Sequence, residues 1–131
     1  MGRAGHAKRA AVLLAVLAHA GPAGCGYTRG RAAAEAAGGD PALGKLHVDA
    51  YGCGTCHTIA NVPGAEGMVG PPLTDVAGRA YIAGRLSNSP GNMAAWIRDP
   101  KAVDEKTAMP TLGVSEQEAR DITAFLYSIQ E

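Results

Sequence analysis

The amino-acid sequence predicts a small, loop-rich all-α domain in roughly the last two thirds of the chain. Two segments begin with an N-cap residue followed by proline, and a third begins with a capping box. No stretch alternates apolar and polar residues as a half-buried strand would. With 131 residues, the chain can form one domain with short additions, and it is too short for a large multidomain enzyme.

The first helix of this domain is expected to begin at Asp40-Pro41 and to run to near Cys53. Asp40 can accept hydrogen bonds from the first turn, and proline suits that turn because its missing N–H would have no partner there. Residues 54–72 are rich in glycine and proline without a clear period, so they are expected to form a loop. A short helical turn is expected after Pro72.

Ser89-Pro90 predicts the start of a second helix, which is expected to extend to about Asp99 and to stop at Pro100. Residues 101–113 are expected to form no regular secondary structure. The third helix is predicted from the capping box at residues 115–118. Its apolar residues recur at helical spacing and indicate an ordinary packed core: Ala119, Ile122, Leu126 and Ile129, with Phe125 beside them.

The N-terminal part of the chain resembles an export signal. Three basic residues lie within positions 1–9, and residues 10–20 are apolar apart from His19. This apolar stretch is shorter than the roughly twenty residues that span a bilayer, so a transmembrane anchor is the weaker alternative. Residues 1–24 are therefore interpreted as a signal peptide.

Two cleavage sites compete in this leader. Cleavage after Ala20 would follow a small-x-small pattern, whereas residues 22–25 resemble a bacterial lipobox with Pro22 in place of the usual leucine. In the second case Cys25 would be acylated and would anchor the protein to a membrane. Residues 25–39 show no apolar periodicity and are interpreted as a flexible tether, which leaves residues 40–131 as the folded domain.

The chemistry of the sequence is concentrated in Cys53-Gly54-Thr55-Cys56-His57. This C-x-x-C-H pattern is the attachment signature of c-type haem, because two thiols one turn apart can bond the two vinyl groups of one porphyrin. The histidine that follows then lies under the iron as an axial ligand. A redox disulfide would need a βαβ context, which is missing here.

A zinc-stabilised binding module is the other alternative for these cysteines. Zinc needs four ligands, and outside the motif the domain offers only His47 and carboxylates. His47 lies six residues before Cys53 on the predicted helix, and we expect it to be a partly exposed helix residue.

Several further segments occur in an order that resembles a class I, mitochondrial-type, monohaem cytochrome c of the bacterial exported kind. The resemblance runs from about Gly44 to Leu126. The matching segments are Gly44, Gly70-Pro71-Pro72-Leu73, Gly78-Arg79, Trp96-Ile97-Arg98-Asp99-Pro100, Thr107-Ala108-Met109-Pro110 and Phe125-Leu126. It implies a small cytochrome c fold, with three main helices and short turns wrapped around one covalent haem c with its iron.

The resemblance also implies roles for individual residues. The Pro71 carbonyl would accept a hydrogen bond from His57 and fix its imidazole. Arg79 would pair with a haem propionate, and Leu73, Trp96 and Thr107 would support the haem. Gly44 would let the first helix cross the last one at Phe125 and Leu126.

Met109 is the expected second axial ligand. Met68 lies in the glycine-rich loop and Met93 at the start of a predicted helix, where methionine more often fills a packing role. Met109 lies in an irregular segment that can cross the distal face, and Pro110 stiffens the backbone there. Ligation by His57 and Met109 would leave no open position on the iron. This indicates that the protein is an electron carrier and not an enzyme. The alternative is a haem-based enzyme or gas sensor with a labile Met109.

Charge divides the chain into two parts. Residues 1–39 carry five basic and one acidic side chain, whereas residues 40–131 carry seven basic and eleven acidic ones. This acidic domain gives no indication of nucleic-acid binding. The expected partners are respiratory redox proteins, namely a terminal oxidase or a quinol:cytochrome c reductase. Lys101 and Lys106 could form a local basic patch beside the Met109 segment. The expected location is the periplasmic side of a bacterial membrane.

Overall fold

The computed structural model describes residues 24–130, and the signal peptide predicted over residues 1–24 lies outside them apart from Gly24. Within this range the chain forms five α-helices, two short 3-10 helices and one two-stranded hairpin. The elements are α1 (Gly24–Ala36), α2 (Pro41–Ala50), η1 (Cys53–Thr55), η2 (Val76–Gly78), β1 (Tyr81–Ile82), β2 (Leu86–Ser87), α3 (Pro90–Arg98), α4 (Pro100–Val103) and α5 (Glu116–Ser128). The predicted all-α fold is confirmed.

The three predicted helices begin where the capping residues indicate. The Asp40 carboxylate accepts hydrogen bonds from the backbone N–H groups of Ala42 and Leu43, at 2.8 and 3.3 Å. Ser89 caps α3 in the same way, and Ser115 with Glu118 forms a complete capping box at the start of α5. These caps satisfy backbone donors that have no partner inside the helix.

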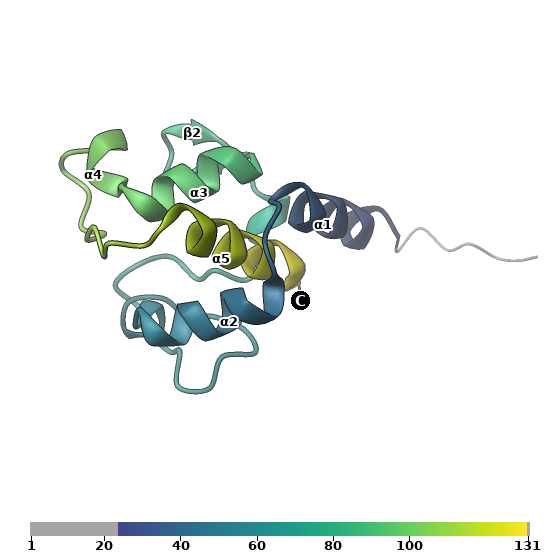
Figure 1. Ribbon diagram of the computed structural model, residues 1–131, viewed down its shortest axis with the longest axis horizontal. Helices are drawn as coiled ribbons and strands as arrows, with labels where there is room; N and C mark the ends of the chain where they lie inside the picture. Colours follow the sequence, from purple (N-terminus) through teal and green to yellow (C-terminus); the bar gives the residue numbers. More distant parts are fainter. Residues whose placement is uncertain (1–23, 131) are drawn as a thin grey trace, which may run out of the picture.

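Helix α5 is the centre of the molecule, with α2 on one side and α3 on the other (Figure 1). Its residues 119 and 121–127 are buried, so this helix is covered on most sides between residues 119 and 127. Gly44 is buried at the crossing of α2 and α5, where a Cβ atom would overlap the Asp121 carbonyl and lie 2.9 Å from Phe125 Cβ. Because Gly44 has no side chain, α2 and α5 can lie in direct contact at this point, as the resemblance implied.

Most of the segment interpreted as a flexible tether, residues 25–39, lies in a helix, because residues 24–36 form α1. Alanine has the highest helix propensity of all residues, which favours this conformation. Gly30, Ala34 and Ala37 are buried and recur at helical spacing, so the helix packs one small-residue face against α5. This face contains glycine and alanine but no large apolar residue, so the sequence pattern does not distinguish it from a linker.

Two smaller elements also differ from the prediction. Pro100 ends α3, but it also begins the short helix α4, in which the Asp99 carboxylate caps Ala102 at 3.2 Å. Strands β1 and β2 form an antiparallel hairpin that pairs Tyr81 with Ser87 and Ile82 with Leu86. Each strand has only two residues, which is too short for alternation to be visible in the sequence.

Candidate functional site

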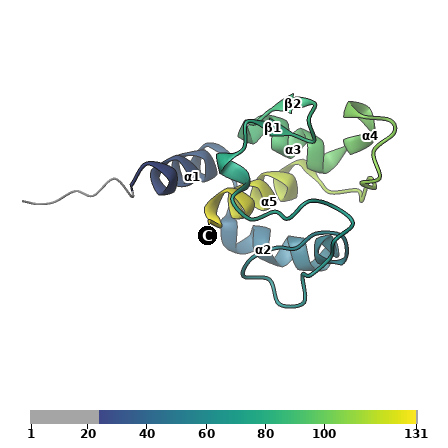
Figure 2. The same cartoon turned by 180° about the vertical axis from the view of Figure 1, so that it is seen from behind.

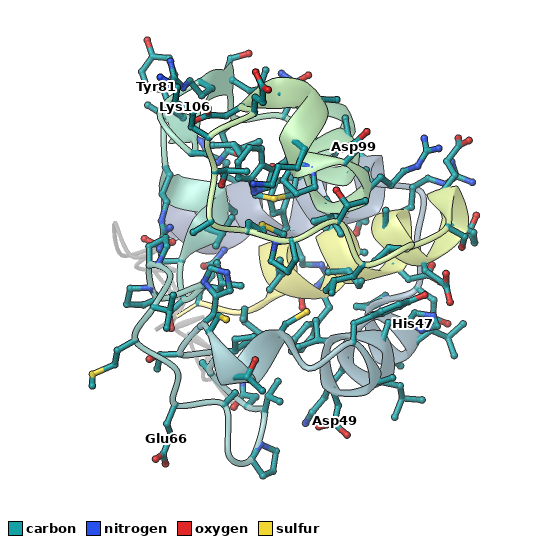
Figure 3. All side chains as sticks on the ribbon, turned by 90° about the vertical axis from the view of Figure 1, so that its left-hand side faces the viewer. His47, Asp49, Glu66, Tyr81, Asp99 and Lys106 are labelled. Carbon is teal, nitrogen blue, oxygen red and sulfur yellow. The ribbon has the colours of Figure 1, made fainter. Side chains whose placement is uncertain are left out.

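The segments that carry the C-x-x-C-H motif and Met109 lie at one end of the molecule. The loop after η1 and the segment between α4 and α5 meet at this end, which is on the left in Figure 1 and on the right in Figure 2. Figure 3 looks directly onto it, with Lys106 on the segment between α4 and α5 and Glu66 on the opposite loop. The two segments are far apart in the sequence, and the helices around α5 bring them to the same place.

The C-x-x-C-H motif starts in the 3-10 helix η1. The backbone N–H groups of Cys56 and His57 both donate to the Cys53 carbonyl, at 3.2 and 3.0 Å. This tight turn presents Cys53, Cys56 and His57 from one short segment. Both thiols are free and half-buried, and burial raises the pKa of Cys53, so its sulfur remains a protonated thiol at neutral pH.

His57 is oriented by the loop that follows it. Its Nδ1 lies 2.7 Å from the Pro71 carbonyl oxygen, which can only accept, so Nδ1 carries the proton. In the neutral imidazole this leaves the other ring nitrogen, Nε2, available as a metal ligand. The hydrogen bond that the resemblance implied is therefore present.

Gly70 lies against the His57 ring. A Cβ atom at this position would be 2.6 Å from Nδ1 and 2.9 Å from Nε2, closer than side chains approach one another. The Gly70 N–H also donates to the Cys56 carbonyl at 2.8 Å. Sequence reasoning identified the segment from its resemblance but missed that Gly70 itself leaves the space in which the imidazole sits.

The rest of this loop is tied back onto the motif. Gly67 donates from its N–H to the Gly54 carbonyl at 3.0 Å, and Leu73 donates to the Thr58 carbonyl at 2.8 Å. Gly67 has no room for a Cβ atom beside the Cys56 backbone, and Gly54 has none beside Ala65. The glycine-rich composition that predicted a loop is thus a packing requirement around the cysteines and His57.

The three methionines of the domain lie in different environments. Met68 is 92% exposed on the loop, and Met93 is 6% exposed inside the core. Met109 is half-buried and packs against the core cluster, as Cys53 and Leu73 do. Its backbone N–H donates to the Thr107 hydroxyl at 3.2 Å. Of the three, Met109 is the one that combines a core-facing position with partial access.

The predicted supporting residues differ in burial and in their contacts. Trp96 is buried in α3, and Leu73 is half-buried against the core cluster. The Lys101 ammonium donates to the Thr107 carbonyl, which ties the Met109 segment to α4. Arg79 is exposed, and its guanidinium donates to the Pro72 carbonyl and, at 3.2 Å, to the Thr74 carbonyl. It therefore braces the backbone that follows Pro71.

His47 lies on α2, and its side chain lies beside α5 (Figure 3). Its Nε2 is 3.5 Å from the Asp121 carboxylate, and its Nδ1 is 3.9 Å from the Glu118 carboxylate. The side chain is about a quarter exposed, as expected for a partly exposed helix residue. It belongs to the helix-crossing contact and is not part of the C-x-x-C-H site.

Two features are absent from residues 24–130, the part of the chain that the structure describes. No group of three or more His, Cys, Asp or Glu side chains is arranged to hold a metal ion within this range. The same residues include no helix that is both long enough and apolar enough to cross a membrane.

The donor set fits a covalently attached haem. Two free thiols lie one turn apart, as attachment to two vinyl groups requires, and the adjacent imidazole has its Nδ1 engaged and its Nε2 available. Partly buried apolar side chains pack on the core and are suited to an apolar cofactor, among them Leu73, Leu86 and Met109. The thioether of Met109 is a suitable soft ligand for haem iron.

Comparisons with known proteins agree with this chemistry. Residues 41–130 match the model of the family described as cytochrome c. The chain is also 32% identical over 88 residues to cytochrome c oxidase subunit 2 of Alkalihalophilus pseudofirmus, an alignment that covers 66% of this chain and 25% of that protein. The chain thus spans about a quarter of the length of this relative. No solved structure matches significantly.

Proposed function

The chain belongs to the cytochrome c family, and from this premise we propose that it is an exported one-electron carrier whose single haem has His57 and Met109 as axial ligands. Members of the family bind haem c covalently and act as electron carriers rather than as enzymes. The observation that carries the proposal is the C-x-x-C-H segment, in which two free thiols precede an imidazole whose Nδ1 is bound by the Pro71 carbonyl.

In this proposal Cys53 and Cys56 form the two thioether bonds and hold the cofactor in a domain with few large apolar side chains. His57 supplies its Nε2 to the iron, while Pro71 keeps the ring oriented and strengthens it as a donor. When bound, the haem supplies one iron that changes between the ferric and the ferrous state. The protein would hold the same side chains around this iron in both states.

Met109 is assigned as the second ligand because of its half-buried position against the core. Thr107 and Lys101 hold its segment through the hydrogen bonds described above. A thioether ligand favours the ferrous state relative to stronger donors. With both axial positions filled by side chains, substrate and oxygen have no free coordination site, which suits electron transfer.

The remaining assignments concern support of the cofactor. Trp96 is buried and Leu73 is half-buried against the core, and both would provide apolar surface to the haem. Arg79 is exposed and carries a positive charge, so it can pair with a haem propionate while it braces the loop after Pro71. Salt would weaken such an exposed pairing.

We also propose respiratory partners for this carrier. The matched relative is a cytochrome c oxidase subunit, which favours a terminal oxidase as the electron acceptor, and a quinol:cytochrome c reductase would be a suitable donor. Such encounters use small, transient interfaces. The leader composition favours the periplasmic side of a bacterial membrane, with attachment through an acylated Cys25. Intact mass of the membrane-extracted protein reports the cleavage site and acylation together.

The test of haem attachment is a pyridine haemochrome assay combined with intact mass. We expect one covalent haem in the wild-type protein and little holoprotein in His57→Ala, since the proximal ligand would be lost. Zinc without haem in the exported protein would refute the proposal. Rapid, complete carbon monoxide binding to the ferrous form at neutral pH would instead indicate an enzyme or gas sensor with a labile Met109.

The test of the distal ligand compares the three methionines. Met109→Ala is expected to abolish the far-red absorption band of thioether-ligated ferric haem. Met68→Ala is the matched exposed control, and Met93→Ala is the matched buried control; both are expected to retain the band. Survival of the band in Met109→Ala, with its loss in either control, would assign the ligand elsewhere.

A further inference from the structure

Asn88 joins three separate parts of the molecule. It lies between β2 and α3, and its side-chain amide donates to the carbonyls of Val76 at 2.7 Å and of Arg79 at 2.8 Å. Its side-chain oxygen accepts a hydrogen bond from the Tyr127 hydroxyl of α5. Its backbone N–H donates to the Ala80 carbonyl at 3.0 Å. Both amide hydrogens and the amide oxygen are thus used.

Tyr127 fixes the orientation of this amide. The tyrosine is 1% exposed, and burial raises its pKa to about 12, so its hydroxyl remains protonated and donates at neutral pH. Because the hydroxyl must find an acceptor, the Asn88 oxygen faces α5 and the Asn88 nitrogen faces residues 76–79. Removing the amide would leave buried polar groups without partners, which is unfavourable.

The hydrogen bonds continue from residues 76–79 to His57. Arg79 donates through its guanidinium to the carbonyls of Pro72 and Thr74. The Pro71 carbonyl, which directly precedes that of Pro72, accepts a hydrogen bond from His57 Nδ1. The path therefore runs from the buried helix α5 through Asn88 and Arg79 to the imidazole, with only short stretches of backbone between the hydrogen bonds.

We propose that Asn88 is a positioning residue for the proximal ligand: it holds the 76–80 segment against α5 and thereby keeps the Pro71 carbonyl at hydrogen-bonding distance from His57. This inference rests on the proposed function, in which His57 ligates the haem iron. The hydrogen bond to Nδ1 makes the imidazole a stronger donor and stabilises the ferric state. Weakening that bond should therefore raise the reduction potential.

The experiment uses Asn88→Leu, which has a similar volume and no charge, in the full-length holoprotein. We expect a higher reduction potential than in the wild type, and a changed chemical shift and faster hydrogen exchange of the His57 Nδ1–H in the ferrous protein. Tyr127→Phe removes only the hydroxyl and retains the ring, so it should shift both quantities in the same direction by a smaller amount. It remains informative if Asn88→Leu does not fold.

Asn92→Ala is the matched control. Asn92 lies one turn further along, and its side-chain amide donates to Ser87, at 2.9 Å to the carbonyl and 3.3 Å to the hydroxyl. This variant should leave the potential and the His57 Nδ1–H signal unchanged. A purely structural role for Asn88 would lower the free energy of unfolding without changing either quantity.

The outcomes separate this inference from the proposed function. An unchanged or lowered potential in both Asn88→Leu and Tyr127→Phe, with covalent haem present and His57 still ligated, would overturn the role of Asn88 alone. Absence of covalent haem from the wild-type protein would overturn the proposed function. A raised potential together with an altered His57 Nδ1–H signal supports the inference.

Discussion

At the scale of single residues, Gly70 controls how closely the loop can approach the His57 imidazole. We predict that Gly70→Ala lowers the yield of holoprotein and broadens or shifts its Soret band, because the added methyl group would displace the ring or the Pro71 carbonyl. The loss of stability should be about 1–3 kcal/mol, the usual range for overpacking. Absorption spectra and denaturant unfolding measure the two effects.

Gly91→Ala is the control for this substitution. Gly91 lies in the first turn of α3, where a Cβ atom would meet no other atom within 4 Å. Its replacement should leave the spectrum unchanged and the unfolding free energy equal or up to ~1 kcal/mol higher, because alanine favours the helix. Equal damage from both variants would contradict a specific role for Gly70.

The residue scale also shows which parts of the site the sequence can predict. The two thiols and His57 lie within five consecutive positions, so local spacing is enough to propose their common chemistry. The contact of Gly70 with the imidazole requires the loop to fold back on itself, and no local pattern encodes that reversal. The role of Asn88 could not be predicted either, because an asparagine shortly before a helix is typical of an ordinary turn.

At the scale of elements, α1 extends the folded unit beyond the matched family region of 41–130. We predict that Ala34→Glu lowers the free energy of unfolding by about 1–3 kcal/mol, since it would place a carboxylate on the face packed against α5. Denaturant titration followed by far-UV circular dichroism measures the loss.

Ala32→Glu is the matched control in the same helix, because Ala32 is exposed. It should change the unfolding free energy by no more than about 0.5 kcal/mol, the usual range for a surface substitution. Equal stability of both variants would mean that α1 does not dock in solution and that the tether interpretation describes this segment better.

The helices that were predicted and the one that was missed differ in the kind of signal they carry. Helices α2, α3 and α5 start at capping residues, and α5 adds a stripe of large apolar residues, so both signals are local. Helix α1 packs through glycine and alanine. These residues occur both in packed helices and in flexible linkers, so their presence does not distinguish the two. Its partner surface on α5 exists only in the folded molecule.

At the scale of the whole molecule, the haem is expected to complete the core. The domain of residues 40–131 has only five aromatic side chains, and several apolar groups near the site are half-buried. We predict that the full-length chain without covalent haem, made as Cys53→Ser/Cys56→Ser, is largely unfolded, because a small domain with a limited core needs a cofactor for stability.

Far-UV circular dichroism and the dispersion of amide signals in nuclear magnetic resonance spectra test this expectation. Low helicity and narrow dispersion are the expected result, with the wild-type holoprotein as the reference. A compact apo-protein with a cooperative thermal transition would show that α1, α2, α3 and α5 form a sufficient core by themselves.

The placement of α1 has a practical consequence for electrochemistry. This helix begins at the end of the molecule opposite to the loops that carry Cys53 and Met109 (Figure 1). Because α1 packs on α5, a surface that holds the protein by the start of α1 also sets its orientation. An electrode that binds the start of α1 would therefore be far from the proposed haem, and direct electron transfer to it would be slow. Soluble redox mediators could still reach the end of the molecule that carries Cys53 and Met109.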